Sequence, residues 1–255
     1  MLGAIAGDII GSVYEHHPIK TEIFPLFSVG CRFTDDTVMT LAVAHAILEG
    51  VDYAAAMKAF GRRYPDAGYG GSFIRWLFED DVKPYNSWGN GAAMRVSPIG
   101  LAFDNVERVL QEARLSAEVS HNHSEGVKGA QATALAVFLA GHGEEKEFIR
   151  HDIMRRFGYN LNRKIAEIRP RYGFDISCQG SVPEAIIAFL DSCNYEDAVR
   201  KAVSLGGDSD TLACIAGGIA AAFYKEIHPA IEATARMLLP EEFLTIIDRF
   251  RKKGG

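Results

Sequence analysis

The sequence has few cysteines, no excess of positive charge and no apolar run long enough to cross a membrane. Its four cysteines, Cys31, Cys178, Cys193 and Cys214, are scattered over 255 residues without a C-x-x-C pair. Isolated cysteines of this kind indicate reduced thiols rather than a disulfide framework or a zinc site. We therefore expect a cytoplasmic protein.

The charge balance and the N-terminal segment argue against further classes of protein. A net charge of −6 does not favour a nucleic-acid-binding surface, because neutralising several phosphates requires clustered Lys and Arg. The first fifteen residues, "MLGAIAGDIIGSVYE", lack a basic region and reach Asp8 too early for a signal peptide. We expect neither a membrane partner nor secretion.

Strand-like alternation is also nearly absent. Residues 22–33, "EIFPLFSVGCRF", look extended, but Pro25 and Gly30 indicate a loop. Apolar residues at three-and-four spacing instead predict helices. They recur within residues 36–50, 105–120, 124–141, 181–192, 195–207 and 210–227. We predict an all-α fold, a compact bundle of many short helices within one domain, residues 1–255.

Two segments depart from this simple pattern. Residues 144–171 are the most charged and basic part of the chain, and we expect a solvent-exposed helical excursion there. The first helix carries Gly3, Gly7 and Gly11 at four-residue spacing. Each interior glycine costs a helix about 1 kcal/mol relative to alanine. The spacing therefore predicts the close approach of another helix or of a ligand.

The most informative motifs are two acidic clusters, each placed directly before an apolar helix. Residues 32–37 read "RFTDDT", and residues 206–211 read "GGDSDT". Helix capping is one explanation, since Asp, Ser and Thr accept hydrogen bonds from the first backbone N–H groups. One residue is enough for a cap, however, and each cluster has two carboxylates.

Convergence of the two clusters on bound metal is the alternative to capping. Four carboxylates within a few ångströms would repel one another by about 4 kcal/mol per pair at 4 Å in a medium of intermediate polarity, so a cation would be required. The donors are carboxylates and hydroxyls without Cys or His. Such hard oxygen ligands favour Mg²⁺ or Mn²⁺ over zinc or copper.

The order of motifs along the chain resembles that of the ADP-ribosylglycohydrolase family, which includes the hydrolase that reactivates ADP-ribosylated dinitrogenase reductase. The resemblance extends over almost the whole chain and is weakest near residues 144–175. The motifs that carry it are "GAIAGDIIGSVYE", "FTDDT", "GNGAAMRVSPIGL", "SHNHSEGVKGAQATA", "SVPEAIIAF" and "GGDSDTLACIAGGIAAA". It implies a compact orthogonal bundle of the family's type, with a binuclear Mg²⁺ or Mn²⁺ centre below an ADP-ribose cleft.

The resemblance also implies roles for individual residues. The metal ligands it implies are Thr34, Asp35, Asp36, Asp208, Asp210 and Thr211. Glu15 ends the family's first helix motif beside the metals, whereas Asp8 in the same motif looks structural. The residue that orients and deprotonates the attacking water is Glu15, Asp36 or Asp208, and the sequence does not choose among them.

The remaining motifs match the rest of an ADP-ribose ligand. In "NSWGNGAAM", Ser87, Trp88, Gly89, Asn90 and Gly91 form a loop whose backbone N–H groups suit a diphosphate, while Trp88 suits stacking. A plain turn with a core Trp is the alternative. His121 matches a position that lines the family's cleft, and we expect a structural role for His123. The stretch from Gly68 to Ser72 lacks the pattern of a triphosphate-binding loop.

The implied function is hydrolysis of the glycosidic bond between ADP-ribose and an acceptor. The substrate would be an ADP-ribosylated protein, a small ADP-ribose conjugate or a nucleic-acid adduct, and we expect the enzyme to act as a monomer. Two alternatives stay open: a hydrolase of another bond in a related nucleotide, and a non-catalytic ADP-ribose-binding relative. The sequence does not identify the acceptor linkage.

Overall fold

The helices begin where short polar side chains precede apolar segments. Thr34, Asp52, Asn105 and Ser177 each accept a hydrogen bond from a backbone N–H group in the first turn of the helix that follows.

A computed structural model describes residues 1–79 and 83–253. The α-helices are α1 (Leu2–Gly11), α2 (Asp35–Glu49), α3 (Tyr53–Arg63), α4 (Gly71–Phe78), α5 (Ser97–Ala102), α6 (Val106–Glu118), α7 (Ser124–Gly141), α8 (Lys146–Phe157), α9 (Ile165–Ile168), α10 (Cys178–Leu190), α11 (Tyr195–Val203), α12 (Ser209–Tyr224), α13 (Pro229–Met237) and α14 (Glu241–Lys253), with a 3₁₀ turn η1 (Asn90–Ala92).

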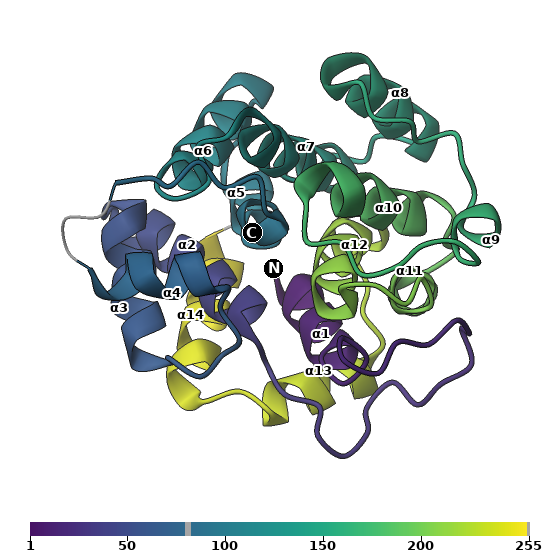
Figure 1. The fold of residues 1–255 in the computed structure, drawn as a ribbon, viewed down its shortest axis with the longest axis horizontal. Coiled ribbons are helices and arrows are strands. Elements are labelled where there is room, and N and C mark those ends of the chain that lie inside the picture. The colour runs from purple at the N-terminus through teal and green to yellow at the C-terminus, as the bar shows by residue number, and fades with distance from the viewer. Residues whose placement is uncertain (80–82, 254–255) are drawn as a thin grey trace.

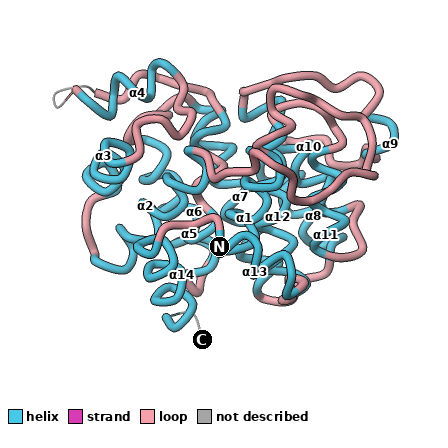
Figure 2. Tube along the Cα trace, turned by 90° about the horizontal axis from the view of Figure 1, so that it is seen from below, coloured by secondary structure: helices cyan, strands magenta, loops and turns pink. Residues whose placement is uncertain are grey.

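The described residues contain no β-strand, which confirms the all-α prediction. Helices α1 and α12 lie together near the middle of the molecule, with α7 and α10 beside them (Figure 1). Helices α2, α3, α4 and α14 form one side, and α8, α9 and α11 lie on the other (Figure 1). Loops gather on one side of the helical body, away from α13 and α14 (Figure 2).

The glycines of α1 explain how it packs so closely on α12. A Cβ atom at Gly3 would lie 2.3 Å from the Cβ of Ala221, one at Gly7 would lie 2.1 Å from the backbone oxygen of Ala213, and one at Gly11 would lie 2.4 Å from that of Ser209. The glycines therefore serve helix packing, the first of the two causes that their spacing suggested. This contact joins two helices about 200 residues apart in sequence.

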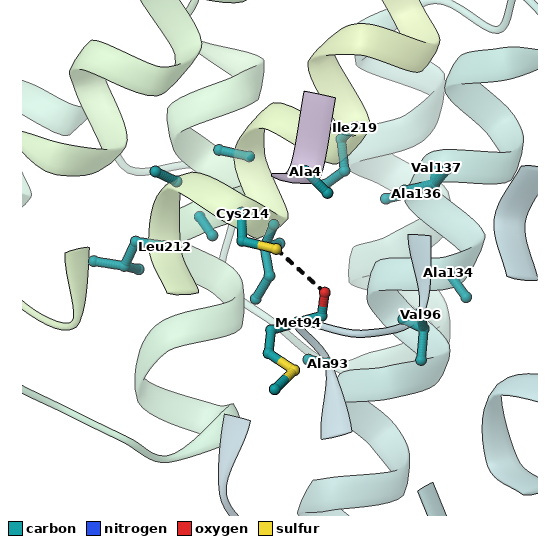
Figure 3. Packing of buried hydrophobic residues seen from close by; sticks show 14 of the residues in the cluster. Ala4, Ala93, Met94, Val96, Ala134, Ala136, Val137, Leu212, Cys214 and Ile219 are labelled. Atoms are coloured by element: carbon teal, nitrogen blue, oxygen red, sulfur yellow. Dashed lines mark hydrogen bonds between the residues drawn. The ribbon is translucent and has the colours of Figure 1, made fainter. Parts of the chain in front are cut away.

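Small and apolar side chains fill the space around this helix pair. Ala4 of α1 and Ile219 of α12 lie near Val137 of α7 in the core (Figure 3). The Cys214 thiol donates a hydrogen bond to the backbone oxygen of Met94, at a distance of 3.3 Å (Figure 3). This contact connects α12 to the segment that follows η1.

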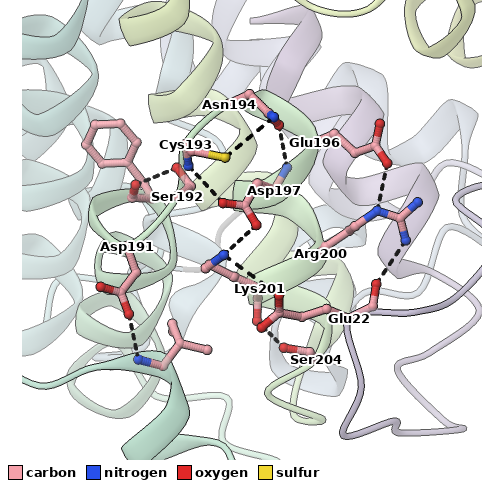
Figure 4. A network of polar contacts seen from close by, with 12 residues as sticks. Glu22, Asp191, Ser192, Cys193, Asn194, Glu196, Asp197, Arg200, Lys201 and Ser204 are labelled. Carbon is pink, nitrogen blue, oxygen red and sulfur yellow. Dashed lines mark hydrogen bonds and ion pairs between the residues drawn. The ribbon is translucent and has the colours of Figure 1, made fainter.

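The predicted loop at residues 22–33 is confirmed, and charged side chains tie it to α11. The Glu22 carboxylate accepts a hydrogen bond from Arg169 and lies 3.7 Å from the Lys201 ammonium group. Arg200 donates to the backbone oxygen of Glu22, at 3.0 Å (Figure 4). The loop is thus held at a defined place after α1.

The structure changes the prediction for residues 144–171. The segment does contain helices α8 and α9, as expected, but it is not simply an exposed excursion. Ile149 and Ile153 of α8 are fully buried, and Arg150 is buried with its guanidinium donating to the backbone oxygen of Leu161. Apolar residues such as Ile149 and Ile153 are four positions apart and form one buried face of α8, although charged residues outnumber them.

Two further features concern helix limits and membranes. Helix α10 begins at Cys178, three residues before the predicted segment, because Ser177 accepts a hydrogen bond from the N–H of Gly180 and caps the helix there. Among the described residues, we find no helix with the length and apolar character needed to span a bilayer.

Candidate active site

Helix α1 places Asp8 at the beginning of α2. The Asp8 carboxylate accepts hydrogen bonds from the backbone N–H of Thr34 at 3.0 Å and of Thr37 at 3.1 Å. It also accepts one from the hydroxyl of each threonine. Four donors occupy both carboxylate oxygens, so Asp8 anchors the first turn of α2. This geometry supports the structural role expected for Asp8.

The two acidic clusters meet in space. The Thr211 hydroxyl, in the first turn of α12, lies 2.8 Å and 3.1 Å from the two carboxylate oxygens of Asp36, in the first turn of α2. These residues are 175 positions apart in sequence. Packing of α1 against both helices brings their N-terminal ends together, and the sequence pattern alone could not establish this.

The acidic residues form two groups that share one member. One carboxylate oxygen from each of Asp8, Asp36 and Asp210 lies within 4.8 Å of the others, and the same holds for Glu15, Asp208 and Asp210. The Asp210 Oδ1 atom is buried and has no hydrogen-bond partner in the described structure. Asp210 therefore belongs to both groups and contributes a carboxylate oxygen to each.

Burial and mutual repulsion make the ionised forms of these carboxyl groups unfavourable. Burial, followed by the charge of Asp210, raises the pKa of Asp35, Asp36 and Asp208 well above their usual range. The same causes raise the pKa of Glu15, and they raise that of Asp8 to about 7 against the opposing effect of its hydrogen-bond donors. Such a cluster favours bound cations.

The donor set fits hard divalent cations. In the described ranges, none of the aspartates of the cluster forms an ion pair with a Lys or Arg, and Glu15 has only the exposed His16 at 3.6 Å. The oxygens are carboxylates, with the hydroxyls of Thr34 and Thr211 beside them. These are ligands that Mg²⁺ and Mn²⁺ prefer, and the unpartnered Asp210 oxygen is available to one.

A cleft of about 610 Å³ opens above the acidic cluster, a size typical of small-molecule sites. The predicted site residues Glu15, Thr34, Asp35, Asp36, Asp208, Asp210 and Thr211 lie on its walls, as do Ser87, Trp88, Gly89, Asn90, Gly91 and His121. The structure thus brings the predicted metal ligands and the predicted substrate-binding residues to one cavity.

The loop at residues 87–91 connects the cleft wall to the acidic cluster. The side-chain amide of Asn90 donates to Asp208 Oδ2 at 2.7 Å, so Asn90 orients a carboxylate. The N–H of Gly89 donates to the Ser87 hydroxyl, and the N–H of Asn90 donates to the backbone oxygen of Ile176. Two of the N–H groups expected to face a diphosphate are therefore already engaged.

Trp88 and the two histidines occupy different environments. Trp88 is 44% exposed at the cleft rim, whereas Trp76 is the core tryptophan at 1%. His121 is buried beside the loop and faces the cleft. His123 is the N-cap of α7, where its Nδ1 atom accepts the N–H of Glu125, so it has the structural role expected of it.

Several cleft residues were not predicted. Gly68 lines the wall, and a Cβ atom at Gly68 would lie 3.4 Å from Asp35 Oδ1. The glycine-rich stretch lacks the pattern of a triphosphate-binding loop, and its sequence does not show that it borders an acidic cluster. The other residues missed are His16, Arg32, Ala67, Gly70, Gly71, Ser72, Phe73, Tyr85, Asn86, Met94, Arg95, Phe174 and Ile176.

A usable signal existed for a few of these residues. Arg95 lies in the apolar stretch "AAMRVSPIGL", where a charged side chain indicates a specific buried partner. Phe174 and Ile176, which are 59% and 50% exposed, lie in a loop and join Trp88 at the rim. Apolar residues exposed on a loop often mark a binding surface, but which cavity they face depends on the tertiary fold.

Comparisons with known proteins identify the family of this chain. Residues 1–252 match the ADP-ribosylglycohydrolase family. The chain is 30% identical to ADP-ribosylhydrolase ARH3 of Mus musculus, over 88% of this chain and 82% of that protein, and 31% identical to ARH3 of Bos taurus, over 88% and 83%. It is 26% identical to ADP-ribosylarginine hydrolase Tri1 of Pseudomonas putida, over 88% and 69%.

The fold is also found in a solved structure. An ADP-ribosylglycohydrolase-related protein complex contains a chain that superposes with a TM-score of 0.68 and 24% identity, over 93% of this chain and 97% of that one. At this identity the likeness concerns the fold. Because the family match extends over nearly the entire sequence, this chain belongs to the ADP-ribosylglycohydrolase family.

Proposed function

We propose that this protein is a metal-dependent hydrolase that cleaves the glycosidic bond between ADP-ribose and an acceptor. The acceptor is a modified protein side chain, a small conjugate or a nucleic-acid adduct. The observation that carries the proposal is the convergence of Glu15, Asp36, Asp208 and Asp210 beneath a cleft of about 610 Å³. Family membership indicates which bond is cleaved, and the acidic cluster below the cleft provides the groups that would bind metal and activate water.

Six residues would hold two divalent cations, Mg²⁺ or Mn²⁺: Thr34, Asp35, Asp36, Asp208, Asp210 and Thr211. Bound there, the cations would polarise water and the vicinal hydroxyls of the ribose. The hydrogen bonds from Thr211 to Asp36 and from Asn90 to Asp208 keep these carboxylates oriented. Asp8 supports them by holding the first turn of α2.

Among the candidate bases, Glu15 is the one best suited to move a proton. Asp36 and Asp208 already accept hydrogen bonds from side chains of the protein. Glu15 lies on the cleft wall with a side chain that is 25% exposed, and its pKa is raised by burial and by Asp210. A raised pKa brings a carboxylate nearer to the range that suits a general base at neutral pH.

The acidic cluster below the cleft would also stabilise the transition state. As the glycosidic bond breaks, positive charge develops on the ribose ring, and nearby carboxylates stabilise it. Trp88 at the rim would stack on an aromatic or sugar ring of the ligand. The loop at residues 87–91 and His121 would contact the polar groups between the two ends of the ligand.

A substrate panel tests the proposed function. Full-length protein is incubated with Mg²⁺ or Mn²⁺ and with arginine-, serine-, acetyl- or nucleic-acid-linked ADP-ribose, and the products are separated by chromatography. We expect free ADP-ribose from at least one substrate, and none after chelation of the metal. Asp35→Asn and Asp210→Asn are the inactive controls.

Each other outcome of this panel favours a different function. AMP as the product would indicate a hydrolase of the diphosphate bond. Binding of ADP-ribose without release from any conjugate would support a non-catalytic relative. Turnover that persists in both Asp35→Asn and Asp210→Asn would contradict the two-metal mechanism. Size-exclusion chromatography with light scattering tests the expected monomer.

A further inference from the structure

A buried arginine, Arg95, lies on the wall of the cleft. It is fully buried, and its Nη2 atom donates to the backbone oxygen of Ser116 at 2.6 Å and to the Ser120 hydroxyl oxygen at 3.2 Å. Burial lowers the pKa of Arg95 to about 10, so it stays charged at neutral pH. Because a guanidinium has donors but no acceptor, the Ser120 oxygen must accept this hydrogen bond.

The contact between Arg95 and Ser120 constrains the direction of the hydrogen bond between Ser120 and His121. The Ser120 oxygen lies 2.8 Å from Nδ1 of His121. Its oxygen already accepts from Arg95, and Nδ1 is the one acceptor within reach of the hydroxyl hydrogen in the described structure. The oxygen has a second lone pair, but if it accepted from Nδ1 its own hydrogen would have no acceptor, so the fully paired arrangement has the hydroxyl donating to Nδ1. A neutral imidazole that accepts at Nδ1 carries its proton on Nε2.

The protonated nitrogen faces the glycines of the loop. A Cβ atom at Gly91 would lie 3.1 Å from His121 Nε2, and one at Gly89 would lie 3.5 Å from it. His121 lines the cleft, and its Nε2 atom has no hydrogen-bond partner in the part of the chain that the structure describes. Burial, and then the Arg95 charge, lowers the pKa of His121 well below its usual range, which keeps the ring neutral.

The loop needs such a donor, because its own N–H groups are partly used. Gly89 and Asn90 donate to other protein atoms, as described above. We propose that Arg95 and Ser120 are positioning residues that keep the His121 proton on Nε2, so that this N–H donates to an oxygen of the ADP-ribosyl group held against the loop. The identity of the ligand rests on the proposed function, whereas the tautomer does not.

The tautomer is measured directly by NMR. The full chain, labelled with ¹⁵N at its histidines, is studied without metal or ligand, and His121→Gln identifies the His121 resonances. We expect a protonated Nε2 and an unprotonated Nδ1 in the wild type. In Ser120→Ala, Nδ1 loses its donor, and we expect a mixture of the two tautomers.

Binding and kinetics provide the second readout. Because only the tautomer with its proton on Nε2 can donate, we expect Ser120→Ala to raise the Kd for ADP-ribose in inverse proportion to the population of that tautomer, about twofold for an equal mixture and about tenfold where the other tautomer predominates. Its KM should rise similarly with little change in kcat, since the bond is formed in both ground and transition states. Ser120→Thr, which keeps the hydroxyl, should restore the tautomer and most of the affinity.

Ser116→Ala is the matched control. Ser116 is as buried as Ser120, its hydroxyl has no partner among the described residues, and its contact with Arg95 uses the backbone oxygen. We expect this variant to behave as the wild type in both measurements. Melting curves of all variants confirm that they are folded.

Two results would overturn the inference. One is a proton on Nδ1 of His121 in the wild type, which requires no variant to fold. The other is a Ser120→Ala protein whose tautomer and Kd both equal those of Ser116→Ala. If the wild type did not bind ADP-ribose at all, the proposed function would fail, and the tautomer would then test the positioning roles of Arg95 and Ser120 alone.

Discussion

Asp210 is the residue at which stability and function oppose each other. It belongs to both groups of carboxylates and is the first neighbour whose charge raises the pKa of Asp35, Asp36 and Asp208. Without metal, its charge destabilises the folded protein. In the proposed metal-bound form, the same charge would help to hold a cation. Substituting Asp210 should therefore change stability and activity in opposite directions.

We predict that Asp210→Asn lowers turnover at least about a thousandfold, because a ligand that both proposed metal positions would share is lost. We also predict that the metal-free variant is more stable than the metal-free wild type by about 2 kcal/mol, since buried like-charge pairs are removed. The release of free ADP-ribose measures the turnover, and thermal melts with chelator and with Mn²⁺ measure the stability. Asp104→Asn, an exposed carboxylate outside the cleft, is the control, and a less stable metal-free Asp210→Asn would contradict this account.

Trp88 allows ligand binding to be followed directly. The chain has two tryptophans, and Trp76 is buried in the core. We predict that ADP-ribose changes the fluorescence of Trp88 and that Trp88→Ala weakens binding about tenfold, within the range found for aromatic stacking. Trp88→Phe should keep most of the affinity and lose the signal. An unchanged signal on saturation, established by calorimetry, would place the ligand away from the rim.

The two acidic clusters could be predicted from sequence because they combine two local patterns, a cap and an excess of charge. Thr34 and Asp36 needed no knowledge of distant contacts to attract notice. The roles of Arg95 and Phe174 could not be inferred in this way, because they depend on which loops meet above α2 and α12. His121 lies between these cases: the family resemblance indicated its position, and its tautomer follows from Ser120.

At the scale of the elements, the contact between α1 and α12 assembles the site. It positions Asp8 at one helix start and brings Asp208 and Asp210 to the same place. The glycine spacing predicted a close helix contact, but the identity of the partner could not be deduced from periodicity. Several helices that are apolar on one face would have been equally suitable partners.

We predict that Gly7→Ala destabilises the protein by about 3 kcal/mol, because its Cβ would lie 2.1 Å from the backbone oxygen of Ala213. A backbone atom within a packed helix cannot move aside as a flexible side chain can. Urea unfolding measures the effect. Gly141→Ala at the end of α7 is the matched control, since its Cβ would be 4.0 Å from the nearest side-chain atom, and its stability should be unchanged or slightly higher.

The variant also tests whether the helix contact supports the site. If α1 is displaced, the acidic groups separate, and Mn²⁺ should stabilise Gly7→Ala less than it stabilises the wild type. A Gly7→Ala protein with wild-type stability and an undiminished response to Mn²⁺ would show that α1 and α12 can separate without consequence for the cluster.

At the scale of the whole molecule, the acidic cluster governs how stability depends on pH. The pKa values of Asp35, Asp36 and Asp208 are raised in the folded protein, and that of Asp8 is raised to about 7. A group with a raised folded pKa binds its proton more tightly when folded. Its unfavourable contribution is absent below the unfolded pKa of about 4 and grows as the pH rises toward the folded pKa.

We therefore predict that the metal-free protein loses a few kcal/mol of stability between about pH 4.5 and pH 7, in the direction opposite to ordinary acid denaturation. Mg²⁺ or Mn²⁺ should abolish most of this loss, because a cation stabilises the ionised carboxylates. Melting temperatures across this range, with chelator and with metal, test the prediction. A metal-free melting temperature that rises steadily toward pH 7 would contradict it.

The pairing of α1 with α12 also has a consequence for the synthesis of the chain. About 200 residues are synthesised between α1 and its packing partner α12. The glycine face of α1 must wait for this partner, and contacts between distant parts of a chain form slowly. The acidic residues therefore come together, and the proposed metal centre can form, only after α12 has been synthesised.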